Sequence, residues 1–304
     1  MKTMSSFEQK FYRNLHWIRR LTQWAVVVFI FVVPFLNRQG IHAIIGTFYS
    51  IRIGHLDLMD PALMFQTILL TQNIYFPAIL AGSIPIILAL VFGRVFCSWM
   101  CPYNLLSEYV GALRKRVFPK KQTRILNHNP RPHWYWTVLG SIVTLLMVSG
   151  LPVITYLSMP GLISSQVADL VLHATIGVEI SLVIILLLIE FFFAPHFWCK
   201  YACPVGAVLT LFHYKHTMRV QFDPKGCTCQ DLKALSCNAA CPLGLDPRHR
   251  DIYPYCYNCG ECIYACHKHQ GKSLSFSFQT NKQKNIIPLK FNEKQDGPFK
   301  EANL

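Results

Sequence analysis

Charged residues are scarce in this chain, and acidic ones are the scarcest. Asp, Glu, Lys and Arg make up 14% of the 304 residues, with 15 acidic against 29 basic side chains, while hydrophobic residues make up 52%. Soluble domains usually carry about 25% charged residues. The low charge content and the positive mean hydropathy argue against an ordinary soluble protein and favour a membrane protein.

Four apolar stretches are long enough to cross a bilayer, which takes about 20 residues of helix. They run from Trp17 to Leu36, from Ile74 to Phe92, from Trp134 to Leu157 and from Leu170 to Phe193. Arg19 and Arg20 lie near enough to the end of the first stretch to snorkel to the interface. No small-residue cleavage site follows that stretch, so a cleaved signal peptide is not expected. The sequence predicts an α-helical membrane protein with a four-helix transmembrane bundle.

Basic residues predict the orientation of this bundle, because they resist translocation. Five Lys and Arg residues lie at or before the start of the first stretch and eight lie between the second and third. The loop after the first stretch has two, and the loop between the third and fourth has none. Both termini are therefore expected in the cytoplasm, in a bacterial inner membrane. The net charge of +14 follows from this topology and from contact with anionic lipid, so nucleic acid is not an expected partner.

All twelve cysteines fall into four groups, and two of the groups share the pattern aromatic-C-x3-C-P. The copies are Phe96-Cys97-Ser98-Trp99-Met100-Cys101-Pro102 and Trp198-Cys199-Lys200-Tyr201-Ala202-Cys203-Pro204. Because the second and fourth stretches run in the same direction, both copies emerge on one face, and each proline disfavours helix at the cysteine before it. The four thiols are expected to converge as a redox-active or metal-binding set. Zinc binding and a purely structural role as buried small residues stay open as alternatives.

The other two groups lie in the polar segment that starts at about His213. The last group, Cys256, Cys259, Cys262 and Cys266, reads C-x2-C-x2-C-x3-C, which is typical of ferredoxins whose fourth cysteine ligates the other cluster. The group before it reads C-x-C-x7-C-x3-C-P, which is irregular. By this rule one [4Fe–4S] cluster takes Cys227, Cys229, Cys237 and Cys266, and the other takes Cys256, Cys259, Cys262 and Cys241. A zinc ribbon is the alternative, and haem c is disfavoured because the C-x-x-C-H spacing is missing.

The order of these features resembles the NapH family, the membrane subunits of a quinol dehydrogenase. The resemblance rests on the two F/W-C-x3-C-P motifs, on Cys203-Pro204-Val205-Gly206-Ala207 and on the paired C-terminal cysteine groups. It implies a ferredoxin-type electron-transfer subunit, not a stand-alone enzyme, that takes electrons from quinol. It further implies a NapG-like iron–sulfur partner and delivery toward a periplasmic c-type cytochrome or reductase of the nitrate reductase type. The irregular group from Cys227 to Cys241 departs from the family pattern.

Two alternatives to a quinol dehydrogenase subunit stay open. CcoG-like membrane ferredoxins, which act in metal handling or oxidase assembly, resemble this chain in the same motifs but are longer. A structural zinc protein that anchors a membrane complex is the other alternative.

The patterns divide the chain into four parts: a cytoplasmic segment at 1–16, a transmembrane domain at 17–212, a ferredoxin-like domain at 213–279 and a polar tail at 280–304. In the fourth stretch, His173 and Glu179 are candidates for accepting protons from quinol, because ionisable groups are rare inside a bilayer. An interhelical hydrogen bond is the alternative for them. Glu190, nearer the cytoplasmic end, is expected to pair with a basic side chain. Asp60-Pro61 predicts the N-cap and first turn of a short outer helix that runs to about Leu70.

Overall fold

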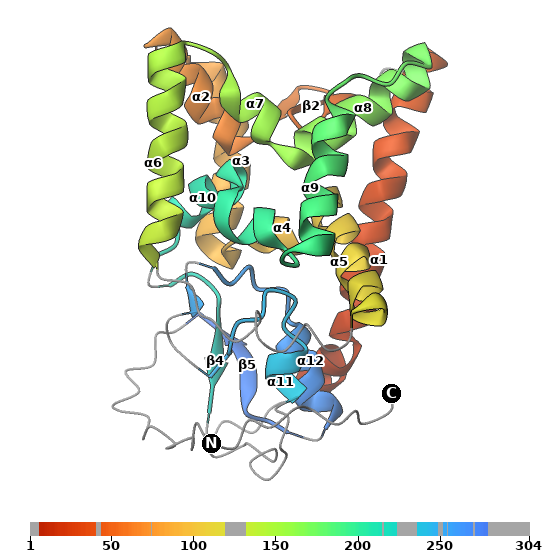
Figure 1. Cartoon of the computed structure of the whole chain (residues 1–304), viewed down its shortest axis with the longest axis vertical. Helices are drawn as coiled ribbons and strands as arrows, with labels where there is room; N and C mark the ends of the chain where they lie inside the picture. The colour runs from red at the N-terminus through yellow and green to blue at the C-terminus, as the bar shows by residue number, and fades with distance from the viewer. Residues whose placement is uncertain are drawn as a thin grey trace.

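The protein is built mostly from helices arranged in two parts. The computed structural model describes residues 6–40, 44–73, 75–118, 132–214, 216–223, 236–248, 252–253, 255–269 and 271–278. A helical part occupies the upper half of Figure 1, and a smaller part with the strands β4 and β5 and the helices α11 and α12 lies below it. The predicted helical fold is thus confirmed. Cys227, Cys229 and the tail at 280–304 lie outside the described residues.

A single long helix joins the two parts. α1 (Ser6–Arg38) starts beside α12 (Glu261–Lys268) and rises to α8 (Met159–His173) in the upper part (Figure 1). Its stretch Glu8–Arg38 is the one helix among the described residues that is long and apolar enough to cross a membrane. Arg19 does not snorkel as predicted, because its side chain is completely buried against other helices.

The other three predicted spans form shorter helices than expected. They contain α3 (Phe76–Phe92), α6 (Pro132–Ser149) and α9 (Ile180–Phe192). Gly150, at φ 64°, ends α6 before the short α7 (Val153–Leu157), and Ala174, at φ 54°, separates α8 from α9. These helices have 17, 18 and 13 residues, fewer than the roughly 20 that a full span needs. Helix length therefore does not confirm the predicted bundle of four full spans.

The end of the helical part farthest from β4 and β5 carries a small antiparallel sheet. Its strands β1 (Ile44–Thr47), β2 (Ser50–Ile53) and β3 (Leu56–Met59) follow one another in sequence order. The predicted short helix comes next as α2 (Pro61–Thr71). Asp60 caps it as expected, with Oδ1 accepting from the Ala62 amide at 2.9 Å while Oδ2 accepts from Ser158 at 2.8 Å.

The smaller part is built on β4 (Arg219–Phe222), which pairs antiparallel with β5 (Leu274–Ser277). The short α11 (Ser236–Ala239) and α12 pack beside this pair. Tyr12 and Leu15 from the start of α1 are buried in the same core as Val220, Ile263 and Leu274. The N-terminal end of α1 therefore completes the core of the ferredoxin-like segment.

Candidate iron–sulfur sites

Each C-x3-C-P motif forms a break between two helices. α4 (Val95–Trp99) precedes α5 (Pro102–Val117), and the π-helical turn η2 (Trp198–Ala202) precedes α10 (Pro204–Leu211). Cys101 and Cys203 are extended, at ψ 118° and 116°, and each is the N-cap of the helix that its proline begins. Proline suits the first helical position because it lacks an N–H that would go unpaired there. Each second cysteine thus starts the next helix, where the sequence alone suggested only that a helix ends.

The amides at these helix starts point at the cysteine sulfurs. Burial raises the pKa of Cys101 and of Cys203, and the backbone amides of Tyr103 and Asn104, and of Val205 and Gly206, oppose this rise. The free amides of a helix N-terminus favour a negatively charged partner. Both second cysteines therefore lie where the backbone stabilises a thiolate.

The structure brings the four cysteines of the two motifs together. Cys97 and Cys203 pack against one hydrophobic core cluster, and Cys101, Cys199 and Cys203 pack against a second one. Burial raises the pKa of Cys199 well above its usual value, and the nearby charges of Glu190 and of the other three cysteines raise it further. Thiolates gathered in an apolar site need a cation to stabilise them. Bound iron would supply that charge.

A second set of four cysteines lines a small cavity in the ferredoxin-like segment. The four are Cys241, Cys256, Cys259 and Cys262. These are the four cysteines that the ferredoxin rule assigns to one cluster. Most of the remaining lining is apolar and includes Val220, Leu243 and Ile252. The site therefore offers sulfur ligands and little else.

This cavity fits a bound [4Fe–4S] centre by its chemistry. Burial raises the pKa of Cys256 and of Cys259 to about 12 and that of Cys241 to about 11. The Leu245 amide donates to the Cys241 sulfur at 3.3 Å, so a third Cys-Pro turn repeats the amide-to-sulfur contact. Among the described residues, no three His, Cys, Asp or Glu side chains are placed to hold a single metal ion. The four sulfurs line a space instead, as ligands of a cubane do.

Only half of the other predicted ferredoxin set lies in the described residues. Cys237 and Cys266 are buried in the same core cluster as Cys262. The Cys266 sulfur lies 3.2 Å from the Ser273 hydroxyl. Their proposed partners Cys227 and Cys229 fall outside the described residues, so this ligand set stays a prediction.

Direct contacts join the two sulfur sets. The Ser98 hydroxyl, inside the first C-x3-C-P motif, donates to the Tyr257 carbonyl at 2.8 Å, inside the last cysteine group. Lys200, inside the second motif, donates from Nζ to the Leu243 carbonyl at 3.0 Å. Cys97 packs in the same cluster as Cys241, Cys256 and Cys259. The two sets are therefore neighbours within one packed region.

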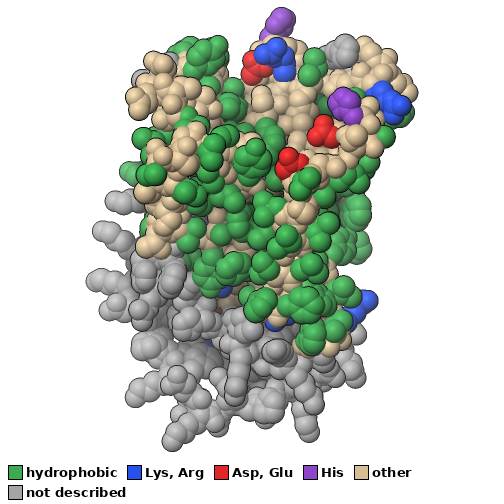
Figure 2. All heavy atoms as spheres, turned by 45° about the horizontal axis from the view of Figure 1, so that its top comes forward, with side chains coloured by type: hydrophobic (Ala, Val, Ile, Leu, Met, Phe, Trp, Pro, Cys, Tyr) green, Lys and Arg blue, Asp and Glu red, His purple; other side chains and the backbone are tan. Residues whose placement is uncertain are grey.

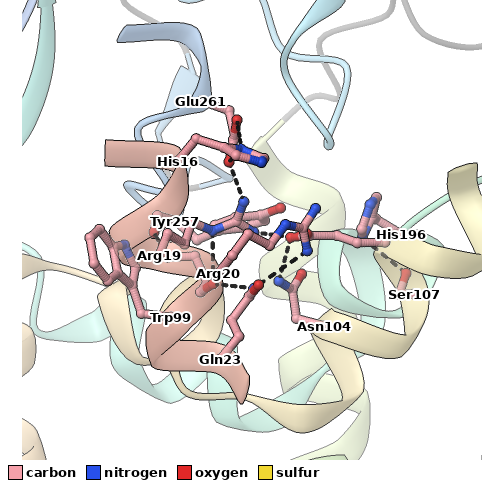
Figure 3. Close-up of polar contacts among 12 residues, drawn as sticks. His16, Arg19, Arg20, Gln23, Trp99, Asn104, Ser107, His196, Tyr257 and Glu261 are labelled. Atoms are coloured by element: carbon pink, nitrogen blue, oxygen red, sulfur yellow. Dashed lines mark hydrogen bonds and ion pairs between the residues drawn. The ribbon is translucent and has the colours of Figure 1, made fainter. Parts of the chain in front are cut away.

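A buried charge network holds α1 against both sets (Figure 3). The completely buried Arg19 side chain pairs with Glu108 of α5 and, at 2.7 Å, with Glu261 of α12, and its Nε donates to the Ser98 carbonyl at 3.1 Å. His16 lies 3.0 Å from Glu261. Sequence patterning missed this network, because its partners are far apart along the chain.

His173 and Glu179 lie at the break between α8 and α9. His173 is largely exposed and lies 3.8 Å from Asp169, and Glu179 accepts from Gln166 at 3.2 Å. The 13 residues of α9, about 20 Å of helix, separate Glu179 from the second motif. The structure does not bring these two candidates to the cysteines.

Glu190, in contrast, lies beside them. It is buried, and it accepts hydrogen bonds from the Ser107 hydroxyl and, at 3.1 Å, from the Trp198 amide. Ser107 also lies 2.9 Å from His196 Nδ1. These neighbours replace the basic partner that the sequence suggested. The sequence signal for this site was a single carboxyl residue in an apolar run, about two helical turns before the second C-x3-C-P motif.

Comparison with known sequences identifies the kind of protein. Residues 74–121 and 175–221 match a family described as a 4Fe-4S binding domain, and each match contains one C-x3-C-P motif. Two matched regions agree with the expectation of two [4Fe–4S] clusters. The sulfur sites and these matches define a ferredoxin-type [4Fe–4S] protein.

Individual relatives extend the similarity over most of the chain. An uncharacterized protein of Methanocaldococcus jannaschii is 30% identical over 203 residues, which are 65% of this chain and 78% of that protein. The ferredoxin-type protein NapH of Haemophilus influenzae is 26% identical over 84% of this chain and 87% of its own length. The methylamine utilization ferredoxin-type protein MauN of Paracoccus denitrificans is 27% identical, over 70% and 62%. No solved structure matches the chain. The chain belongs to the NapH family of ferredoxin-type proteins, as its motifs predicted.

Proposed function

We propose that this chain is a membrane iron–sulfur electron-transfer protein that acts as a subunit of a quinol dehydrogenase. One observation carries the proposal: two sets of four cysteines adjoin each other, one at the ends of apolar helices and one in a ferredoxin-like segment. A bound [4Fe–4S] centre accepts and returns one electron at a time. Adjoining centres would let electrons pass from the helical part into the ferredoxin-like segment.

The residues assign three ligand sets. Cys241, Cys256, Cys259 and Cys262 hold one centre, since they line a common cavity. Cys97, Cys101, Cys199 and Cys203 hold another, at the regions that match a 4Fe-4S binding domain. Cys227, Cys229, Cys237 and Cys266 form the remaining ferredoxin set. The chain itself supplies the thiolates, the amides that point at them and the apolar walls that keep water out.

The surface of the helical part supports a multi-pass topology. Trp24, Val28 and Phe35 of α1, Leu80 of α3 and Leu188 of α9 are all exposed, and apolar patches of this extent indicate contact with lipid. Figure 2 shows hydrophobic side chains over much of the visible face, with Asp, Glu and His near its top. We infer that α1, α3, α6 and α9 cross the bilayer, which thins locally where these helices are short.

The orientation follows from the basic residues. The start of α1 packs against α12, so the N-terminal end and the ferredoxin-like segment share one side. Lys and Arg gather on that side of the chain, which favours the cytoplasm of a bacterial inner membrane. Both termini would then be cytoplasmic.

The proposed electron donor is a membrane quinol, and the proposed partners are iron–sulfur and haem proteins. A NapG-like protein and a periplasmic c-type cytochrome or reductase would receive the electrons, as the NapH resemblance implies. His173 and Glu179, at the end of the helical part far from the ferredoxin-like segment, are candidates for accepting the quinol protons. A role in metal handling or oxidase assembly, as in CcoG-like ferredoxins, is the second candidate function.

Quinol-driven reduction in membranes tests this function. Membranes that contain the chain are given a reduced quinone under anaerobic conditions, and reduction of the iron–sulfur centres is followed by EPR. We expect reduction in the wild type and slower reduction in Glu179→Gln. Asp57→Asn, which changes an exposed carboxyl in β3 at the same end of the helical part, is the matched control. Centres that dithionite reduces but quinol does not would refute the dehydrogenase role and favour the assembly role. Stoichiometric zinc without acid-labile sulfide would refute both.

A further inference from the structure

Three buried cations surround the two sulfur sets. Arg19, Arg94 and Lys200 are 0%, 3% and 6% exposed. Arg19 is compensated by the two carboxylates of Glu108 and Glu261. The other two lie at the C-x3-C-P motifs: Arg94 is three residues before Cys97, just ahead of the first motif, and Lys200 follows Cys199 inside the second. Arg94 lies near both sulfur sets, whereas Lys200 faces the ferredoxin-like set.

Arg94 contacts both C-x3-C-P motifs. It is the N-cap residue of α4, and its carbonyl accepts from the Cys97 amide at 3.1 Å. Its Nη2 donates to the Cys199 carbonyl at 3.4 Å. Its positive charge also lowers the pKa of Cys203, against the larger effect of burial. Arg94 therefore touches the first motif, the second motif and the space between them.

The ferredoxin-like set lies on the other side of Arg94. The residues just before it contact Asn258, whose Nδ2 donates to the Phe92 carbonyl at 2.9 Å, and a Cβ on Gly93 would lie 2.9 Å from the same nitrogen. Asn258 stands between Cys256 and Cys259 in the last cysteine group. Cys97, three residues after Arg94, packs in the same cluster as Cys241, Cys256 and Cys259. One guanidinium thus lies within the electrostatic reach of both sulfur sets.

The Lys200 side chain is directed at one sulfur set. Its Nζ donates to the Leu243 carbonyl at 3.0 Å, next to Pro242 and Cys241. Its charge acts on Cys241. Lys200 therefore faces the ferredoxin-like set, although it belongs to the second C-x3-C-P motif, and it offers a matched comparison with Arg94.

We propose that Arg94 is a positioning residue shared by the two centres: its buried charge favours the reduced state of both and keeps their reduction potentials matched. This inference rests on the proposed function, in which both sulfur sets hold [4Fe–4S] centres. Each centre takes up one electron when it is reduced and therefore becomes more negative by one charge. The electron that one centre gains is the electron that its neighbour loses. Arg94 takes up neither electron nor proton, because a guanidinium stays charged. A buried cation is poorly screened by salt, and local charge is one of the factors that set cluster potentials.

Redox titration of the purified full chain tests the inference. EPR spectra are recorded over a range of applied potentials for the wild type, Arg94→Gln and Lys200→Gln, after iron and sulfide analysis shows equal centre content. Cys203→Ser and Cys262→Ser assign each signal to its sulfur set. We expect Arg94→Gln to shift both potentials downward, by about tenfold in the reduced-to-oxidised ratio, or about 59 mV for a one-electron couple. Lys200→Gln should shift only the centre of the ferredoxin-like set.

A second variant covers the case in which Arg94→Gln does not assemble. Arg94→His keeps a ring N–H donor at this buried position but is expected to be neutral, because burial lowers the pKa of the neighbouring His213 to about 4. Both potentials should therefore fall in this variant as they do in Arg94→Gln. Two intact centres of which only one responds, or none, would overturn the inference and leave the proposed function standing. A wild type with fewer than two centres would overturn the proposed function itself.

Discussion

Removing the Arg19 charge should destabilise the whole assembly. Arg19→Met keeps the length of the side chain but leaves Glu108 and Glu261 without their shared partner, and their side chains are only 5% and 12% exposed. Breaking a buried ion pair by removing one partner costs about 3–5 kcal/mol. Arg20 still pairs with Glu108 at 2.7 Å, and His16 still lies 3.0 Å from Glu261. We therefore expect a loss near the lower end, about 3 kcal/mol, which is more than a hundredfold in the folding equilibrium.

The assay is denaturant unfolding of the detergent-solubilised chain, followed by the absorbance of its iron–sulfur centres. Arg20→Met is the matched control: it removes the neighbouring charge, but this side chain is 27% exposed, so the expected loss is about 1 kcal/mol or less. The triple variant Arg19→Met, Glu108→Gln, Glu261→Gln should recover most of the lost stability, because it leaves neither carboxylate charge buried without Arg19. A loss below about 1 kcal/mol in Arg19→Met, or a triple variant no better than the single one, would refute the reasoning.

Two further predictions concern residues beside the cysteines. Asn258, at φ 52°, donates to the carbonyls of Phe92 at 2.9 Å and Met218 at 2.8 Å. Asn258→Ala should therefore lower the free energy of unfolding by about 2–3 kcal/mol in the same assay. A loss below about 0.5 kcal/mol would contradict the role of these hydrogen bonds. Burial lowers the pKa of His196 to about 3, whereas an unfolded His titrates near 6.5. The unfolded state binds this proton first, so stability should fall as the pH drops below about 6.5, by about 2 kcal/mol at pH 5. His196→Gln should remove that part of the acid sensitivity, and an unchanged pH dependence would count against a neutral buried imidazole.

Local sequence patterns predicted the local chemistry well. The Asp60-Pro61 pair predicted both the N-cap and the start of α2, because a capping carboxylate and an N1 proline act within one helical turn. The Cys-Pro pairs marked where sulfurs lie, since proline restricts the backbone at the cysteine before it. The cysteine spacing also identified the set that lines the cavity.

Features set by tertiary contact could not be found in this way. A long apolar run does not show where a helix breaks, so the separation of α8 from α9 at Ala174 was missed. Arg19 looked like a snorkelling residue because its partner Glu261 lies 242 positions away. Ser98 and Tyr257, which are in contact, are 159 positions apart in the sequence. Hydropathy patterns carry no information on such pairs.

The most direct test of this account is an iron and acid-labile sulfide analysis combined with EPR on the anaerobically purified chain and on two variants. We expect Cys262→Ser to remove one [4Fe–4S] signal and Cys203→Ser to remove a different one, so that each variant keeps the signal that the other loses. If both variants kept the wild-type iron, sulfide and EPR spectrum, or if the wild type contained no sulfide, the sulfur sets described here would not be iron–sulfur sites.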